Sequence, residues 1–165
     1  MKLATLTSLH ERRSRLGDLV LAHGCFDVIH VGYVRHLQQA RWLGSTLVVT
    51  VTPDRFVNKG NGRPLFPEDV RVEVVAALEC VDYAALNLWP TAVETILALR
   101  PKIYVKGSQF RGRMTPMLVE EAAAVKSVGG ELRFTDEIQH SSKAVIEGRR
   151  FVRPGEAYAE VTRCE

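Results

Sequence analysis

Short apolar runs alternate with longer segments of helical period along most of the chain. Five runs have the length and composition of strands, namely residues 18–23, 46–51, 81–86, 102–105 and 131–135. Between them, apolar positions recur every three to four residues, which predicts helices over 32–43, 67–78, 90–100 and 115–128. A short polar helix precedes the first strand, and a last helix is expected to begin near Ser141. Strands separated by helices favour a parallel sheet with right-handed crossovers. We therefore expect an α/β, Rossmann-like three-layer fold with a five-stranded parallel sheet.

Glycines and prolines lie near the predicted helix ends. Gly44 and the pair Gly129 and Gly130 stand where helix C-caps belong, and prolines near the first helical position are Pro67, Pro90 and Pro116. A parallel sheet of this kind binds ligands beyond the carboxyl ends of its strands, where the strand order reverses. That rule selects residues 24–33, 52–66, 106–113 and 136–143 as the ligand edge.

Length and composition favour one globular domain over residues 1–165, and the polar, weakly patterned residues 148–165 are expected to form a surface extension. The net charge of +3 is small and the basic residues are scattered, so we expect no nucleic-acid partner. No apolar run is long enough to predict a membrane span. The three cysteines show no CxxC spacing, so neither disulfides nor a zinc site is predicted, and a cytoplasmic location fits best.

The stretch GCFDVIHVGY, residues 24–33, carries the clearest chemistry. Gly24 turns the chain after the first strand, which places His30 and Tyr33 at the start of the next helix, three residues apart on one face. Unpaired backbone N–H groups and the positive end of the helix dipole collect there, which predicts a phosphate site. No GxGxxG follows the first strand and no GxxxxGK[ST] occurs, so a dinucleotide-binding domain and a P-loop NTPase are not supported.

The same stretch resembles the GxFDxxHxGH motif of nucleotidyltransferases, and the likeness extends along roughly residues 15–147. GCFDVIHVGYVRHLQQARWLG, NGRPLFPEDVRVEVVAALECVDYAAL, LRPKIYVKGSQF and SSKAVI occur in the order and at the spacings found in that family. The chain is most similar to the heptose-phosphate adenylyltransferase group and the related glycerol-phosphate cytidylyltransferases.

The resemblance implies transfer of AMP or CMP from a nucleoside triphosphate to a phosphorylated sugar or polyol, with release of pyrophosphate. ATP is the first expectation and CTP the second. The acceptor phosphate is itself the nucleophile, so the protein has to position the reactants and stabilise charge at the α-phosphorus. Mg²⁺ is expected to arrive with the nucleotide, and a homodimer is implied, whereas residue spacing encodes no metal site.

The motif positions imply three catalytic residues. His30 is expected to donate to a phosphate oxygen, Tyr33 to replace the second motif histidine as a neutral donor, and Lys59 in NKGNGRP to close over the triphosphate. A satisfied half-buried histidine and a solvated lysine are the structural alternatives for His30 and Lys59. The expected nucleotide-binding residues are Gly24, Cys25, Phe26, Asp27, His30, Gly32, Lys106, Gly107, Ser141 and Ser142.

Some of these residues have simpler interpretations. Cys25 is more often a small hydrophobe under a turn than a reactive thiol, and Asp27 either binds the N–H groups of its own turn or contacts the ligand. Ser141 is also a good N-cap, although Ser142 and Lys143 beside it favour phosphate binding.

The expected acceptor-binding residues follow the second and fourth strands, and they are Arg63, Arg71, Gln109, Arg111 and Arg113. Arg71 lies one helical turn after Pro67, so burial against an acid is its alternative. A solvated basic loop is the alternative for Arg111 and Arg113. Gln109 stands where many relatives have an acid, and a neutral amide loses the charge-assisted grip of a carboxylate on hydroxyl groups. Because Tyr33 and Gln109 both depart from the pattern, the rival function is a nucleotide-binding protein of the same fold that has lost catalysis.

Overall fold

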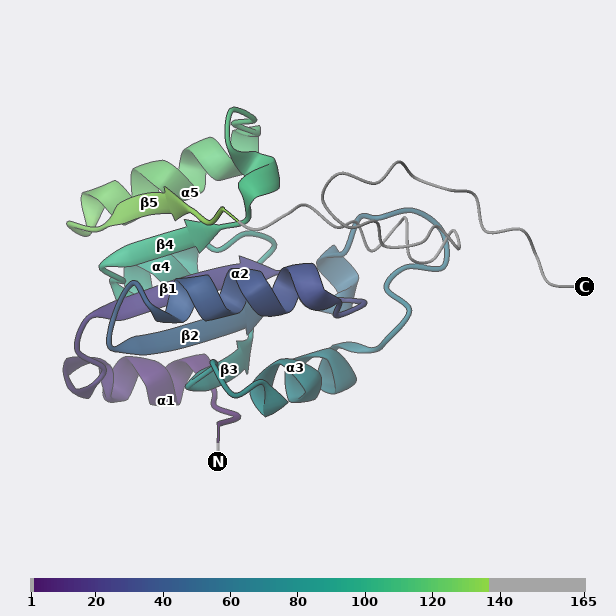
Figure 1. The fold of residues 1–165 in the computed structure, drawn as a ribbon, viewed down its shortest axis with the longest axis horizontal. Coiled ribbons are helices and arrows are strands. Elements are labelled where there is room, and N and C mark those ends of the chain that lie inside the picture. Colours follow the sequence, from purple (N-terminus) through teal and green to yellow (C-terminus); the bar gives the residue numbers. More distant parts are fainter. Residues whose placement is uncertain (1, 137–165) are drawn as a thin grey trace, which may run out of the picture.

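The computed structural model describes residues 2–136, which form a parallel sheet covered by helices on both faces (Figure 1). The strands are β1 (Leu19–Gly24), β2 (Thr46–Val51), β3 (Tyr83–Leu86), β4 (Ile103–Lys106) and β5 (Glu131–Phe134). The helices are α1 (Leu6–Glu11), α2 (Val31–Arg41), α3 (Glu68–Ala77), α4 (Val93–Leu99) and α5 (Pro116–Ser127), with 3-10 turns at Arg13–Arg15, Asp54–Phe56 and Ser108–Phe110.

The five strands lie in the order β3-β2-β1-β4-β5, and every pairing is parallel. The chain builds β1, β2 and β3 outward in one direction and then crosses to the other side of β1 to add β4 and β5. The strand order therefore reverses between β1 and β4, where Ala22 pairs with Val105. The predicted five-stranded Rossmann-like fold is confirmed, and this reversal defines where a ligand is expected to bind.

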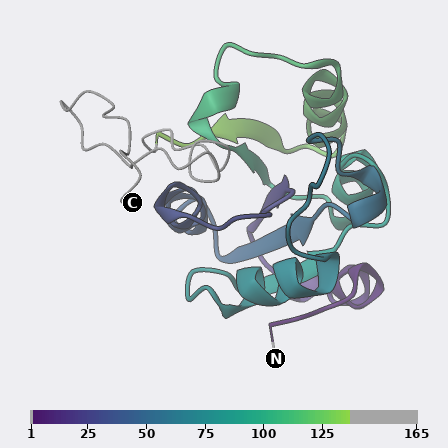
Figure 2. The ribbon, with the colours of Figure 1, turned by 90° about the vertical axis from the view of Figure 1, so that its right-hand side faces the viewer.

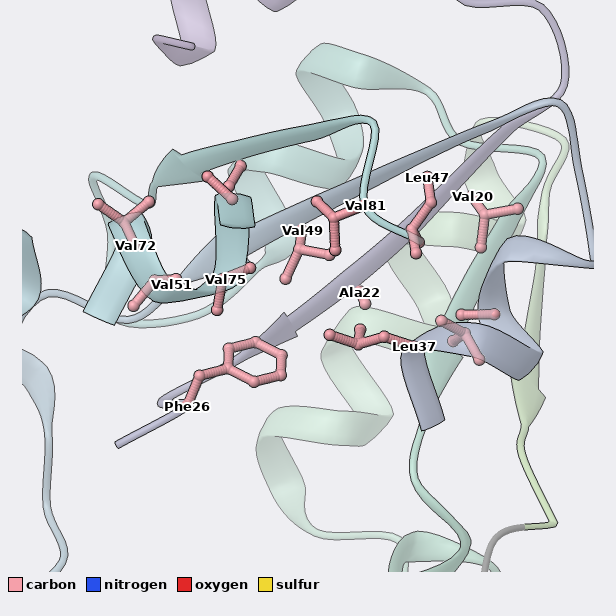
Figure 3. Close-up of a cluster of buried hydrophobic side chains, with 14 of the residues drawn as sticks. Val20, Ala22, Phe26, Leu37, Leu47, Val49, Val51, Val72, Val75 and Val81 are labelled. Atoms are coloured by element: carbon pink, nitrogen blue, oxygen red, sulfur yellow. The ribbon is translucent and has the colours of Figure 1, made fainter. Parts of the chain in front are cut away.

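Alternation along the strands divides the core between the two faces of the sheet. Val20 and Ala22 of β1 pack in the cluster under α2 and α3, whereas Leu19 and Leu21 pack in the cluster under α1, α4 and α5. Figure 2 shows α2 on one side of the sheet with α4 and α5 on the other, and Figure 3 shows the first cluster, in which Phe26 also lies. Strands buried on both faces explain why their sequences read as apolar runs.

The predicted boundaries agree with the observed strands to within two residues, and two expectations about helix ends are wrong. Pro90 does not open α4, because Asn87 donates to the carbonyls of Trp89 and Thr91 and holds this stretch as a loop until Val93. Gly44 does not cap α2, which ends at Arg41. Glycine is required there for another reason, since an added Cβ would lie 2.4 Å from the Asp18 carbonyl oxygen.

The other predicted boundary residues behave as expected. Gly129 follows α5 with a φ of +83°, Pro116 is the first residue of α5, and Pro67 is the N-cap of α3. The helix predicted near Ser141, and the end of the ligand-edge segment 136–143, lie outside the described residues. Within residues 2–136, no helix is both long enough and apolar enough to cross a bilayer.

Candidate functional site

A cavity of about 550 Å³ opens at the carboxyl ends of β1 and β4, where the strand order reverses. The loops after β1, β2 and β4 line it together with the start of α2 and one face of α5. The cavity brings together ten of the residues predicted from sequence, namely Gly24, Cys25, Phe26, His30, Gly32, Tyr33, Lys59, Lys106, Gly107 and Gln109. Position in the fold and position in the predicted motif therefore select the same place.

The turn after β1 is shaped by Phe26, whose backbone adopts a left-handed φ of +49° while its ring is buried in the core. A non-glycine residue in this region is unusual and persists only where its surroundings hold it. The ring lies over Gly24, where an added Cβ would come within 3.3 Å of it. Anchoring Phe26 in the core thus fixes the path of the backbone into α2.

His30 is the N-cap of α2, and its ring Nδ1 accepts a hydrogen bond of 3.1 Å from the backbone N–H of Gly32. An acceptor Nδ1 carries no proton, so the neutral ring has its proton on Nε2. A protonated ring would lose this cap, and the positive end of the helix dipole also opposes a cation here. The geometry therefore makes His30 a neutral N–H donor.

Tyr33 lies on the same turn of α2 and packs against both aromatic neighbours. Its ring centroid is 4.5 Å from that of His30 and 5.4 Å from that of Phe26. Tyr33 lines the cavity, so the residue in place of the expected second histidine keeps a hydroxyl there and adds a ring that supports His30.

Asp27 and Arg63 join the loop after β1 to the loop after β2. The Oδ1 of Asp27 accepts from the N–H groups of Leu65 and Phe66, at 2.8 and 3.1 Å, and its Oδ2 lies 2.5 Å from a guanidinium nitrogen of Arg63. Asp27 therefore binds a distant segment and not the N–H groups of its own turn. Neither Asp27 nor Arg63 lines the cavity.

Arg71 does not line the cavity either, and its side chain is fully buried. Its guanidinium donates to the carbonyls of Cys25, Thr52 and Phe66 and forms an ion pair of 2.6 Å with Asp54. This geometry matches the alternative in which Arg71 is buried against an acid. One side chain thus connects the loop after β1 to both ends of the loop after β2.

On the β4 side, Lys106 lies in the cavity wall beside Glu121 of α5 and Tyr104 of β4. The Lys106 ammonium is 3.4 Å from the Glu121 carboxylate and donates to the Tyr104 hydroxyl at 3.1 Å, and that hydroxyl donates to Glu121 at 2.8 Å. Burial lowers the pKa of Lys106, and the Glu121 charge acts in the opposite direction. Sequence patterns did not single out Glu121 or Tyr104, because their proximity to Lys106 arises only from the packing of α5 on the sheet.

His23, the penultimate residue of β1, also lines the cavity and was not predicted. Its Nδ1 and Nε2 lie 3.0 and 3.3 Å from the hydroxyls of Thr50 and Thr52. Burial, and then the positive charge of Lys106, lower the pKa of His23 to about 3, so the ring is neutral at physiological pH. Its place at the carboxyl end of a predicted central strand was the signal that could have found it.

His36 is a further unpredicted residue of the cavity, one turn along α2 from Tyr33. Its Nδ1 lies 2.7 Å from the hydroxyl of Thr135, which in turn donates to the Lys106 carbonyl at 3.3 Å. The pair joins α2 to the ends of β4 and β5. The helical spacing from Tyr33 was the available signal, but the partner Thr135 lies 99 residues away in the chain.

The remaining predicted residues are distributed around the cavity. Lys59 is exposed on the loop after β2, and Gln109 is exposed on the turn after β4. Arg111 forms an ion pair with Asp136, and both it and Arg113 are exposed and outside the cavity lining. Burial raises the pKa of the Cys25 thiol, with Lys59 and Arg71 opposing, which disfavours a thiolate. Ser141, Ser142 and Lys143 lie outside the described residues.

Within the part of the chain that the structure describes, no three His, Cys, Asp or Glu side chains are grouped so that they could hold a metal ion. The charged cavity groups on this part of the chain are Lys59, Lys106 and Glu121. Two of these three groups are cations, and together with the N–H groups at the start of α2 they favour an anionic ligand, whereas Glu121 adds a negative charge that is paired with Lys106.

Comparison with known proteins agrees with the fold and the motif. A family model described as cytidylyltransferase-like matches residues 21–150. The bifunctional protein HldE of Syntrophotalea carbinolica is 39% identical over 140 residues, which are 84% of this chain and 28% of that protein. The bifunctional protein HldE of Streptomyces coelicolor is 43% identical over 121 residues, or 72% of this chain and 25% of that protein. The chain thus spans little more than a quarter of the length of these relatives.

Solved structures share the same arrangement of strands and helices. The lipopolysaccharide core biosynthesis protein of Thermoplasma volcanium matches with a TM-score of 0.59 and 25% identity, over 76% of this chain and 99% of that one. A pantothenate synthetase of Thermus thermophilus matches with a TM-score of 0.60 over 88% of this chain and 67% of that one, but at 18% identity it supports the fold alone.

Proposed function

The chain belongs to the cytidylyltransferase-like family, and from this premise we propose that it transfers a nucleotidyl group from a nucleoside triphosphate to a phosphorylated sugar or polyol. The relatives named HldE support an enzyme of the nucleotidyltransferase class. We propose ATP as the donor, with CTP second, and a nucleoside-diphosphate-activated sugar or polyol as the product.

The proposed step is an in-line displacement. An oxygen of the acceptor phosphate attacks the α-phosphorus, the bond from that phosphorus to the bridging oxygen breaks, and the bond electrons leave with pyrophosphate. The protein contributes position and charge stabilisation. The N–H groups at the start of α2 and the Nε2–H of His30 face charge that builds on the α-phosphoryl group and the leaving pyrophosphate.

The observation that carries this proposal is the cap formed by His30. Because Nδ1 accepts from Gly32, the ring presents Nε2–H as a donor beside the N–H groups of α2 in a cavity at the switch point of the sheet. Lys59 is exposed on the loop after β2 and reaches the same cavity, which suits a charge delivered as that loop closes on the triphosphate.

The helix dipole also bears on Tyr33. Tyr33 is the third residue of α2, where the positive end of the dipole opposes a cation, so a histidine there would also act mainly as a neutral donor. Replacing a histidine by tyrosine at this position therefore removes less positive charge than a comparison of the two free side chains in water would suggest. This favours retained catalysis over the alternative of a binding protein.

We propose that the nucleotide binds as its Mg²⁺ complex, with the ion held largely by phosphate oxygens and water, as expected where the described residues group no metal ligands. Formation of a homodimer and a cytoplasmic location also remain proposals. Sedimentation of the purified chain tests the first of these.

The decisive experiment incubates the chain with Mg²⁺, each nucleoside triphosphate and a panel of sugar and polyol phosphates while pyrophosphate is measured. We expect acceptor-dependent release of pyrophosphate with one triphosphate preferred. Tight binding of a nucleotide without release from any combination would support the impaired binding protein instead, and absence of binding would refute both.

A further inference from the structure

On the β4 side, burying the network of Lys106, Tyr104 and Glu121 costs desolvation free energy. A contribution to stability alone therefore does not explain why this ion pair is buried beside the cavity. The side chains of Lys106 and Glu121 are only 11% and 2% exposed. Desolvation of a buried ion pair commonly offsets its attraction, so well-packed apolar residues would stabilise the fold as well. Such a pair beside a cavity is typical of a functional site.

The network is oriented toward the cavity. Glu121 is the more deeply buried partner, and its second oxygen accepts from the N–H of Ala92 at 3.1 Å, which fixes the carboxylate against the start of α4. Lys106 lies between this carboxylate and the rings of Tyr104 and Phe110, and its ammonium is 3.5 Å from the carbonyl of His23. Both residues line the cavity, and the ammonium belongs to the more exposed side chain of the two, so the pair presents more of its positive end than of its negative end to the cavity.

We propose that Glu121 is a positioning residue that, together with the Tyr104 hydroxyl, holds Lys106 as an ammonium at the switch point of the sheet, where it binds a phosphate of the nucleotide. The inference rests on the proposed function and adds to it a residue of α5 that touches no reacting atom. Glu121 acts only through Lys106.

The pH dependence of nucleotide affinity can report the charge of Lys106 if the other titratable groups that face its ammonium keep their charge. They are Glu121 on α5, Tyr104 on β4 and His23 on β1. Burial, and then the Glu121 charge, raise the pKa of Tyr104 well above its ordinary value, and the pKa of His23 is lowered to about 3. Neither group changes charge between neutral and moderately alkaline pH, so an alkaline loss of nucleotide affinity in this wall reports Lys106.

The Glu121 charge and burial shift the pKa of Lys106 in opposite directions, and this determines how nucleotide affinity changes with pH. Burial lowers the pKa of Lys106 and the Glu121 charge raises it. A phosphate binds the ammonium and not the neutral amine, so affinity falls as pH rises through this pKa. Removal of the Glu121 charge lowers the pKa further and moves the loss of affinity to lower pH.

The experiment measures the dissociation constants of Mg²⁺-ATP and Mg²⁺-CTP by calorimetry, from about pH 7 to about pH 10, for the full chain and its variants. Glu121→Gln keeps an acceptor for Ala92 and removes the charge. We expect it to bind about tenfold more weakly at the alkaline end, with the loss of affinity shifted by about one pH unit or more. Glu120→Gln, exposed and adjacent on α5, is the matched control and is expected to follow wild type.

Lys106→Met tests whether Glu121 works through the lysine. We expect this variant to bind weakly and to show a smaller alkaline loss of affinity than wild type, and the double variant with Glu121→Gln to bind no more weakly than Lys106→Met alone. Additive losses in the double variant, or a wild-type pH profile for Glu121→Gln, would overturn the inference.

Circular dichroism and thermal unfolding show whether each variant folds. If Glu121→Gln does not fold, Tyr104→Phe is measured instead, with a smaller shift in the same direction expected and an unchanged profile counting against the inference. Wild type that binds neither nucleotide would refute the proposed function and this inference together, whereas wild type that binds while the variants keep its profile would refute the inference alone.

Discussion

The two sides of the cavity obtain their positive potential in different ways. On the β1 side, backbone N–H groups at the start of α2 and a neutral His30 face the ligand, and all of them come from one stretch of ten residues, 24–33. On the β4 side, a full charge on Lys106 is supported by Tyr104 and by Glu121, which lies on a different element 15 residues further along the chain.

This difference predicts different responses to mutation and to pH. Fixed backbone dipoles do not titrate, so the potential that the N–H groups of α2 supply on the β1 side does not change with pH while the protein is folded. The β4 side depends on a lysine whose pKa is already lowered by burial. Substitutions on each side of the cavity, and on the strand between the two sides, can test this difference.

Arg71→Met is expected to lower the free energy of unfolding by about 3–5 kcal/mol, mainly because three loop carbonyls lose this buried donor and also because Asp54 loses its ion pair. Chemical denaturation measures this. Arg35→Met, on the exposed face of α2, is the control and should change stability little. A fully stable Arg71→Met variant with weakened acceptor binding would instead place Arg71 among the substrate contacts.

His30→Asn is expected to reduce kcat by about 10² to 10³, the usual effect of removing one transition-state donor. Asparagine retains the ability to cap α2, so stability should change little, whereas His30→Ala also removes the cap. Steady-state pyrophosphate release measures kcat, and His10→Asn at an exposed position is the control. Equal losses of stability and activity would identify His30 as a structural histidine only.

Tyr33→Phe keeps the ring contacts with His30 and Phe26 and removes only the hydroxyl. If the hydroxyl donates to a phosphate oxygen, kcat/KM should fall by a factor equivalent to roughly 1 to 3 kcal/mol, and Tyr33→His should keep or improve activity. A Tyr33→Phe variant as active as wild type would leave Tyr33 as a packing residue that supports His30.

His23→Gln examines the strand that separates the two sides. Its folded pKa of about 3 lies below the ordinary value of 6.5, so the unfolded chain binds the proton between these values and wild-type stability falls as the solution is acidified. One such group contributes a slope of at most about 1.4 kcal/mol per pH unit. Denaturation at several pH values between about 4 and 6 should show a shallower slope for the variant. An unchanged slope would mean that His23 is protonated in the folded protein.

Local sequence patterns predicted most of the architecture and one side of the site. Apolar runs located the five strands, which are buried on both faces, and helical periodicity located the four helices between them. The turn after β1 and the start of the next helix were also predicted, since an N-terminal phosphate site is built from consecutive residues; the structure adds that His30 caps the helix on which Tyr33 lies.

Which side chains from distant parts of the chain contact one another depends on how the helices and strands pack. Arg71 and Lys106 are both cations near the predicted ligand edge, but one is used within the protein and the other lines the cavity. Glu121 is a site residue because a helix packs on the sheet, and this packing leaves no local pattern in the chain. His23 lies at the carboxyl end of a predicted strand, but its contacts with Thr50 and Thr52 depend on the packing of β1 against β2. Contacts between residues far apart in sequence depend on that packing, whereas capping and periodicity depend on neighbours a few residues away.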